Sequence, residues 1–243
     1  MMNITAGAVR LWILHVVMNV FLILGIYAWL SIGDANGAQL AGTVIYGIAI
    51  AFLGLWLYDG TFVWFSNIPR RGLAISFARA LRTLAPFTLM AGFALLIYWL
   101  LSRATDQIPD SAATAASWLT LKLRHPVKPA TIARVLRWLV LLVEWFGAPL
   151  LLLPITASVA SRGWLGFGRH RFDALRRRYL VECPTYLIIA FLVPYAITHW
   201  VPGVHGFTWQ TVSAALRFAA AYLIFVTAWL ALTLVTASRP RPD

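Results

Sequence analysis

Residues 162–184 read RGWLGFGRHRFDALRRRYLVECP, and this stretch decides between two classes of protein. Taken alone, its arginines, interleaved with Trp164, Phe167, Phe172 and Tyr179, are typical of a surface that binds nucleic acid. In this chain, however, the stretch lies between two long runs that contain almost no charge. The class of the protein therefore depends on what those two apolar runs are.

The composition of the whole chain favours a membrane protein. Of the 243 residues, 61% are hydrophobic and 12% are charged, and the mean hydropathy is +0.78. A soluble domain carries about 25% charged residues, so this chain has roughly half the charged residues that a water-facing surface of this size needs. The 12 Trp and 8 Tyr fit the same interpretation, because amphipathic aromatic rings favour the headgroup region of a bilayer.

Six stretches are long and apolar enough to cross a membrane as helices, since spanning the hydrocarbon core takes about 20 apolar residues. These stretches are residues 11–32, 41–65, 84–101, 138–159, 179–201 and 212–236. The first is longer than the apolar core of a signal peptide, usually about 7–15 residues, so we expect it to be retained. The sequence predicts an all-α fold, a polytopic transmembrane helical bundle that forms a single integral membrane domain over residues 1–243.

The segments between the spans differ in charge, and this difference predicts the orientation. Basic connectors at 66–83 and 160–178 lie on the same side as both termini, and that side carries 13 Lys and Arg. The other side carries six, within an outer amphipathic segment at 103–137. Because positively charged loops stay in the cytoplasm, we expect cytoplasmic termini in a bacterial-type inner (plasma) membrane.

Prolines predict where helices end or bend. In the outer segment a helical pattern extends to Leu123, and the sequence HPVKP at 125–129 is expected to break it. Prolines inside the fourth and fifth spans are expected to kink these helices without breaking them, because neighbouring helices can satisfy the freed carbonyls. These prolines are Pro149, Pro154, Pro184 and Pro194.

The opening stretch is therefore interpreted as an interfacial connector along the cytoplasmic face, with its rings at the interface and its arginines toward anionic headgroups. The net charge of +12 fits nucleic acid or anionic lipid, but no module that reads DNA or RNA is present in the sequence. We expect lipid binding and no nucleic acid. The predicted lipid-binding residues are Arg70, Arg71, Arg79, Arg82, Arg169, Arg171, Arg176, Arg177 and Arg178.

Four polar residues are expected in the cytoplasmic half of the membrane: His15, Asn19, Asp59 and Glu182. Polar and ionisable groups are costly in hydrocarbon, so each of these residues is expected to have a structural or functional role. One hypothesis is a site open to the cytoplasm for a proton, a metal or a substrate headgroup, in which His15 and Asp59 pair beside Asn19. The other is structural, with the two acids neutralising nearby arginines such as Arg82.

Two further charges are expected at similar depth in the outer half of the membrane, Glu144 in the fourth span and Arg217 in the sixth. An ion pair between them would join two helices, because paired charges are far cheaper in lipid than isolated ones. Alternatively, Arg217 snorkels toward the outer surface. Pairing between helices is the interpretation we adopt.

The sequence contains no motif that assigns chemistry. Motifs of metalloproteases, serine hydrolases and P-loop nucleotide binders are missing, and the histidines do not form a pair at matched depth that would hold a haem. His125, His199 and His205 lie near the outer surface, but their spacing is not that of a known metal site. We therefore predict no cofactor, no metal and no catalytic residue.

The function predicted from these patterns is a non-catalytic membrane subunit or scaffold that binds partner helices or anionic lipid. The alternative is a transporter or permease component for a small molecule or ion, with His15, Asp59 and Glu144 along its path. A lipid-modifying enzyme is a third possibility, which would need a second acid, a histidine or a metal in contact with one of these acids.

Overall fold

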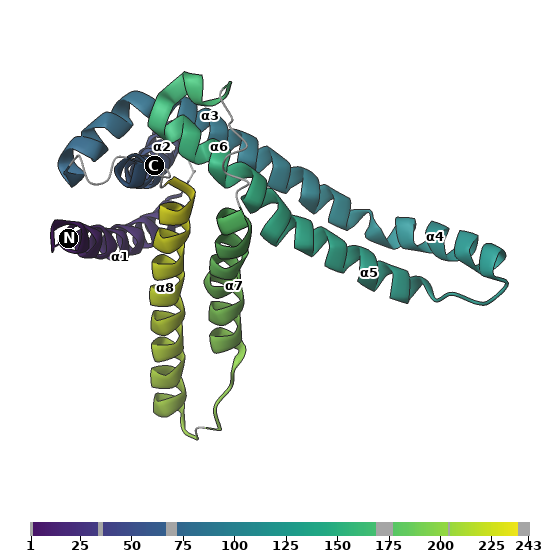
Figure 1. Cartoon of the computed structure of the whole chain (residues 1–243). Helices are drawn as coiled ribbons and strands as arrows, with labels where there is room; N and C mark the ends of the chain where they lie inside the picture. Colours follow the sequence, from purple (N-terminus) through teal and green to yellow (C-terminus); the bar gives the residue numbers. More distant parts are fainter. Residues whose placement is uncertain (1, 34–35, 67–71, 169–176, 204, 238–243) are drawn as a thin grey trace. The chain divides into compact units, whose positions relative to one another are not determined.

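Every secondary-structure element in the described part of the chain is a helix (Figure 1). The computed structural model describes residues 2–33, 36–66, 72–168, 177–203 and 205–237, and only the backbone at residues 2–5, 177 and 178. The helices are α1 (Met2–Leu30), α2 (Gly37–Ser66), α3 (Leu73–Asp106), α4 (Ile108–Leu123), α5 (Pro129–Leu142), α6 (Ala148–Arg162), α7 (Arg177–His199) and α8 (Phe207–Ala237). A π-helical turn, η1 (Val143–Gly147), joins α5 to α6, and a 3-10 turn, η2 (Gly163–Gly166), follows α6.

Six helical stretches are long and apolar enough to span a membrane, so the chain is a multi-pass integral membrane protein. They are Ala6–Leu30, Gly37–Ser66, Leu73–Asp106, Pro129–Gly166, Tyr179–His199 and Phe207–Ala237. In their most apolar windows only 6% to 33% of residues are buried within the protein, so most of these apolar surfaces are available to lipid. The predicted fold class, an all-α polytopic helical bundle, is confirmed.

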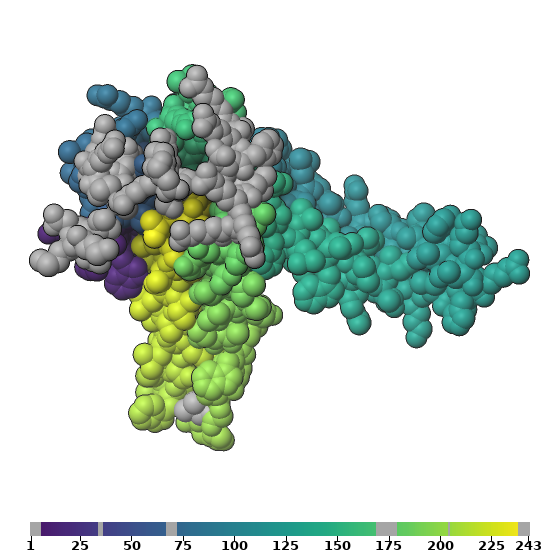
Figure 2. Space-filling view, viewed as in Figure 1, coloured from purple at the N-terminus to yellow at the C-terminus, as the bar shows by residue number. Residues whose placement is uncertain are grey.

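The chain divides into two compact units, which we describe separately: one comprises residues 1–88 and 154–243, the other residues 89–153. In the first unit, α1, α2 and α8 pack against one another, and α7 packs along α8. Figure 2 shows the surfaces of α7 and α8 adjoining. The largest fully buried side chains include Phe62, Leu11 and Leu57, and Cys183 on α7 is also fully buried.

Helix α2 approaches the first turns of α3 at Gly60. A Cβ atom added to Gly60 would lie 2.6 Å from the ring of Phe77, so a larger side chain would displace that ring. Beside this contact the Trp56 ring packs edge-on to Phe77 at 5.4 Å, and its Nε1 donates a hydrogen bond of 2.9 Å to the Phe77 carbonyl. Glycine at this position therefore lets the two helices come close enough to bond.

In the second unit α4 and α5 lie side by side as a hairpin (Figure 1). Helix α4 ends at Leu123, as expected, because Arg124 adopts a left-handed conformation with φ 53°. The backbone N–H of Val127 donates to the Thr120 hydroxyl at 3.0 Å, which closes the turn. Helix α5 then begins at Pro129, a residue suited to the first helical position because its missing N–H would be unpaired there anyway.

The π-helical turn also has a local cause. The Ala148 N–H donates to the Val143 carbonyl, five residues back, so it does not bond the Glu144 carbonyl as it would in an α-helix. Residue 149 is proline, which has no N–H to donate to Glu144 instead. The Tyr98 hydroxyl of α3 donates to the Glu144 carbonyl at 3.1 Å and satisfies the orphaned acceptor.

Candidate functional site

His15 of α1 is fully buried against α2. Its Nε2 lies 2.7 Å from the Thr61 hydroxyl oxygen, while Thr61 donates its single proton to the Leu57 carbonyl at 2.8 Å. Thr61 must therefore accept from His15, which assigns the imidazole proton to Nε2. The other nitrogen, Nδ1, is buried and has no hydrogen-bond partner among the described residues.

Asp59, also on α2, is fully buried and bonded to α3. The Thr83 hydroxyl donates to its Oδ2 at 2.9 Å and has a longer contact of 3.3 Å with the Ala80 carbonyl. Within the described ranges, Oδ1 of Asp59 has no partner. The bond that Asp59 makes is thus to a neutral hydroxyl, whereas the structural hypothesis had expected an arginine.

The aromatic ring of Tyr58 packs between His15 and α8. The Tyr58 ring packs edge-on to His15 at 5.5 Å and to Trp229 of α8 at 5.5 Å. The Tyr58 hydroxyl donates to the Asn19 side-chain oxygen at 3.2 Å. Asn19 therefore lies near His15, as helical spacing predicts, but it bonds Tyr58. The structure does not join His15 to Asp59 by a hydrogen bond.

Two more hydrogen bonds connect α1 to α8. The Trp12 ring N–H donates to the Thr227 hydroxyl at 3.0 Å, and the Tyr222 hydroxyl donates to the Val16 carbonyl at 2.7 Å. Trp229 Nε1 is a third buried atom that lacks a hydrogen-bond partner in the described part of the chain. Several polar side chains of this unit thus form hydrogen bonds between spanning helices.

Arg217 of α8 caps the end of α7. Its Nη1 donates to the backbone carbonyls of Thr198, at 3.3 Å, and Trp200. Its Nε donates to the backbone carbonyl of Ser213 at 3.2 Å. Carbonyls in the last turn of a helix have no partner within the helix, so a cation there satisfies them. The bonds of Arg217 are therefore to the backbone, while Glu144, its expected partner, belongs to the other unit.

The remaining predicted residues are placed as follows. Glu182 is half-buried on α7, and Glu144 is half-buried in η1. Arg177 and Arg178 lie on the first turn of α7, with no description of their side chains. The predicted lipid-binding residues outside the described ranges are Arg70, Arg71, Arg169, Arg171 and Arg176.

Arg79 and Arg82 line a cavity of about 770 Å³ between α3 and the end of α6. Sequence reasoning missed two of its other residues, Arg162 and Trp164, because a turn must bring them opposite α3. Gly163 makes this turn with φ +62°, a conformation that favours glycine. The full lining is Ile75, Ala78, Arg79, Arg82, Thr83, Ser161, Arg162, Gly163, Trp164 and Leu165.

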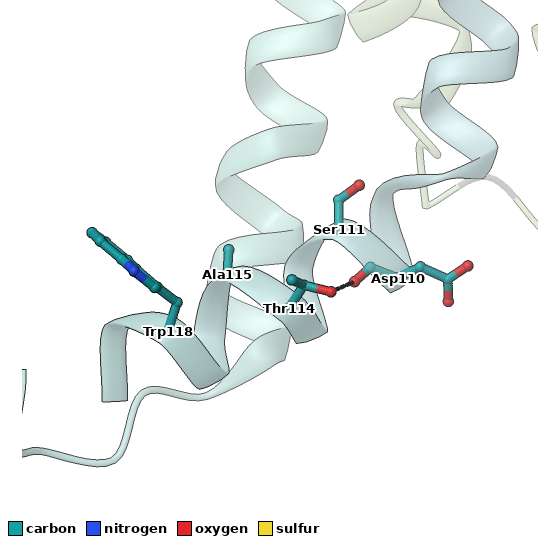
Figure 3. Close-up of a pocket in the computed structure, with 5 residues that line it drawn as sticks. All are labelled: Asp110, Ser111, Thr114, Ala115 and Trp118. Atoms are coloured by element: carbon teal, nitrogen blue, oxygen red, sulfur yellow. Dashed lines mark hydrogen bonds between the residues drawn. The ribbon is translucent and has the colours of Figure 1, made fainter. Parts of the chain in front are cut away.

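A second hollow, of about 650 Å³, lies on α4 (Figure 3). Its lining residues are Asp110, Ser111, Thr114, Ala115 and Trp118, all from this one helix. The Thr114 hydroxyl donates to the Asp110 carbonyl of the preceding turn at 3.0 Å, so it is already satisfied within the helix. Because no second element contributes a side chain, this hollow lacks the convergent polar groups that define a ligand site.

Across the described residues, no group of three or more His, Cys, Asp or Glu side chains is placed to hold a metal ion. His199 and His205 instead bond locally: their Nδ1–H groups donate to the backbone carbonyls of Tyr195 and Gly203, respectively, each at 2.9 Å.

Comparison of the chain with protein-family models, with curated proteins and with solved structures finds no match. The geometry of the chain itself is therefore the basis for proposing a function.

Proposed function

We propose that this protein is a non-catalytic membrane subunit or scaffold. Its lipid-exposed helix faces would bind the spanning helices of a partner, and its basic connectors at 66–83 and 160–178 would bind anionic headgroups. In this proposal both termini lie in the cytoplasm and the membrane is an inner (plasma) membrane.

The observation that supports this proposal most is how the buried polar groups are used. His15 bonds Thr61, Asp59 bonds Thr83, and Tyr58 bonds Asn19, and each bond joins two different helices. Hydrogen bonds between transmembrane helices contribute roughly 0.6–1.7 kcal/mol each, so they favour a fixed arrangement of α1, α2 and the start of α3. A fixed arrangement suits a scaffold better than a carrier, whose helices must rearrange.

One observation favours the alternative of a transporter component. Asp59 Oδ1 and His15 Nδ1 are both buried without a partner in the described structure, and unpaired buried polar atoms are costly. In transporters, intramembrane acids and histidines form relays for protons or sites for ions. On this alternative, Asp59 and His15 would exchange a proton or hold a cation during a transport cycle.

Purification of the full chain in two lipid-preserving media, a mild detergent and polymer nanodiscs, tests the proposal. The expected result is a second membrane protein at constant stoichiometry in both media. An unrelated six-span protein, expressed and purified in parallel, controls for proteins that bind any exposed apolar helix. Recovery of the chain alone in both media would reject the subunit proposal.

The substitution Asp59→Asn separates the scaffold from the transporter. As a scaffold element, the variant should keep its partner and lose only a modest part of its yield, because an amide oxygen still accepts from Thr83. Loss of a transport phenotype at unchanged yield and unchanged partner content would instead favour the alternative.

A further inference from the structure

The strongest candidate for a ligand site is the cavity between the first turns of α3 and the end of α6. Three arginines line it, Arg79, Arg82 and Arg162, and its described lining contains no acidic residue. Like charges gathered in one cavity repel one another, so an anion bound among them would lower the electrostatic free energy.

Local structure accounts for the convergence of the three arginines. Arg79 and Arg82 are three residues apart and therefore share one face of α3. Arg79 Nη2 makes a long hydrogen bond of 3.4 Å to the Ser161 carbonyl, which holds it beside the end of α6. Helix α6 ends at Arg162, directly before the left-handed Gly163, and Arg162 lines the same cavity.

The turn that forms the far wall is tightly packed. A Cβ atom on Gly166 would lie 2.5 Å from the Val159 backbone, and the Ser158 hydroxyl donates to the Gly166 carbonyl at 3.2 Å. Trp164 and Leu165 line the cavity and are exposed, with exposed fractions of 62% and 69%. The wall therefore presents large apolar groups next to the cations.

This combination indicates the chemistry of the ligand. Planar guanidinium groups bind phosphate oxygens through pairs of parallel hydrogen bonds, a geometry that the point charge of a lysine ammonium does not offer. The cavity lies at the ends of two spanning stretches: one begins at Leu73, and the other ends at Gly166. We propose that it binds a phosphate group, carried by an anionic phospholipid headgroup or by a free phosphate. This proposal deepens the lipid-binding part of the proposed function and rests on it.

The test measures binding to the full chain in detergent by native mass spectrometry and calorimetry. One arm titrates phosphatidylglycerol against phosphatidylcholine, and the other titrates inorganic phosphate alone. Binding in the first arm only identifies a lipid headgroup as the source, and binding of inorganic phosphate identifies free phosphate; both support the site. Binding in neither arm overturns it.

Substitution links the binding to the cavity. The triple variant Arg79→Gln/Arg82→Gln/Arg162→Gln should bind at least about tenfold more weakly, since each hydrogen bond to a charged group contributes about that factor or more. The matched control, Arg103→Gln/Arg134→Gln/Arg137→Gln, removes as many exposed charges from the other unit and should change affinity less than about twofold. Equal losses in both triples would overturn the proposal, because they would show only a dependence on total charge.

A second variant controls for the possibility that the glutamine triple misfolds. Arg79→Lys/Arg82→Lys/Arg162→Lys keeps all three charges but loses the paired hydrogen bonds, so its affinity should lie between those of the wild type and the glutamine triple. Affinity of the lysine triple equal to that of the wild type would reject paired guanidinium recognition. If the wild-type protein co-purifies with a partner but binds phosphate in neither arm, this inference alone is rejected. If the wild-type protein is recovered without a partner, the proposed function is rejected.

Discussion

At the scale of single residues, two buried threonines bond the buried ionisable groups of α1 and α2. Thr61 accepts from His15, and Thr83 donates to Asp59. Neither threonine stands out in the sequence, because a threonine within an apolar helix usually bonds only to its own backbone. His15 and Asp59 could be selected from the sequence as costly groups in hydrocarbon, but the residues that pair with them could not.

Replacing Thr61 by Val should destabilise the protein, because it removes the acceptor of a buried imidazole N–H. We expect a loss of about 1–2 kcal/mol in the free energy of unfolding in micelles. The control is the same substitution in the background His15→Leu: no imidazole N–H remains to lose its acceptor, so Thr61→Val should then cost less than about 0.5 kcal/mol. Equal costs in the two backgrounds would contradict the assignment of Thr61 as the acceptor of the imidazole proton.

Replacing Thr83 by Val should leave both oxygens of Asp59 without a partner, at a cost of about 1–3 kcal/mol. The double variant Asp59→Leu/Thr83→Val should recover much of this loss, since no carboxyl group remains to be stranded. Unfolding by sodium dodecyl sulfate in mixed micelles measures both values. A double variant as unstable as Thr83→Val would show that the Asp59–Thr83 bond does not account for the loss.

At the scale of elements, the sequence predicts the spanning helices better than their ends. Helix α3 runs without a break from Leu73, through part of the segment expected as a connector, to Asp106. A hydropathy average does not detect this extension, because the first turns of α3 contain polar residues and lower the average. These turns are helical all the same, since they continue a helix that the apolar residues form. The π-helical turn was equally hidden, since it depends on the coincidence of Pro149 with a tyrosine on another helix.

The π-helical turn predicts a non-additive pair of substitutions. Tyr98→Phe should cost about 1–2 kcal/mol of unfolding free energy, because the Glu144 carbonyl then lacks a donor. Pro149→Ala restores a backbone N–H at that position and allows regular α-helical pairing. In its background, Tyr98→Phe should cost less than about 0.5 kcal/mol. Additive effects in this double-mutant cycle would contradict the assignment of the hydroxyl to the orphaned carbonyl.

At the scale of the whole molecule, composition and the pattern of apolar runs were sufficient to predict the class. The low fraction of charged residues and the six long apolar runs predict a helical membrane protein, and the structure confirms this class. Orientation is harder to predict than class. Basic residues occur in the segments on both sides of the membrane, and only the difference in their number indicates which side is cytoplasmic. The expectation of cytoplasmic termini therefore stays a prediction.

Reporter fusions test that orientation directly. A fusion after Gly168 should be active as a cytoplasmic reporter, and fusions after Gly33 and Arg124 should be active as outer reporters, because the first position adjoins the arginine-rich connector. Alkaline phosphatase and green fluorescent protein at each site give opposite readouts. The reverse pattern at all three positions would invert the topology, and with it the leaflet that the arginine-lined cavity faces.

The full burial of Cys183 has a practical consequence for anyone who labels this protein. It is the one cysteine in the sequence, and it is shielded by packing, so maleimide reagents should react with it slowly in the folded state. A thiol introduced at an exposed position would then carry nearly all of the dye or spin label. Accessibility scanning and distance measurements should thus be feasible in the otherwise unaltered chain.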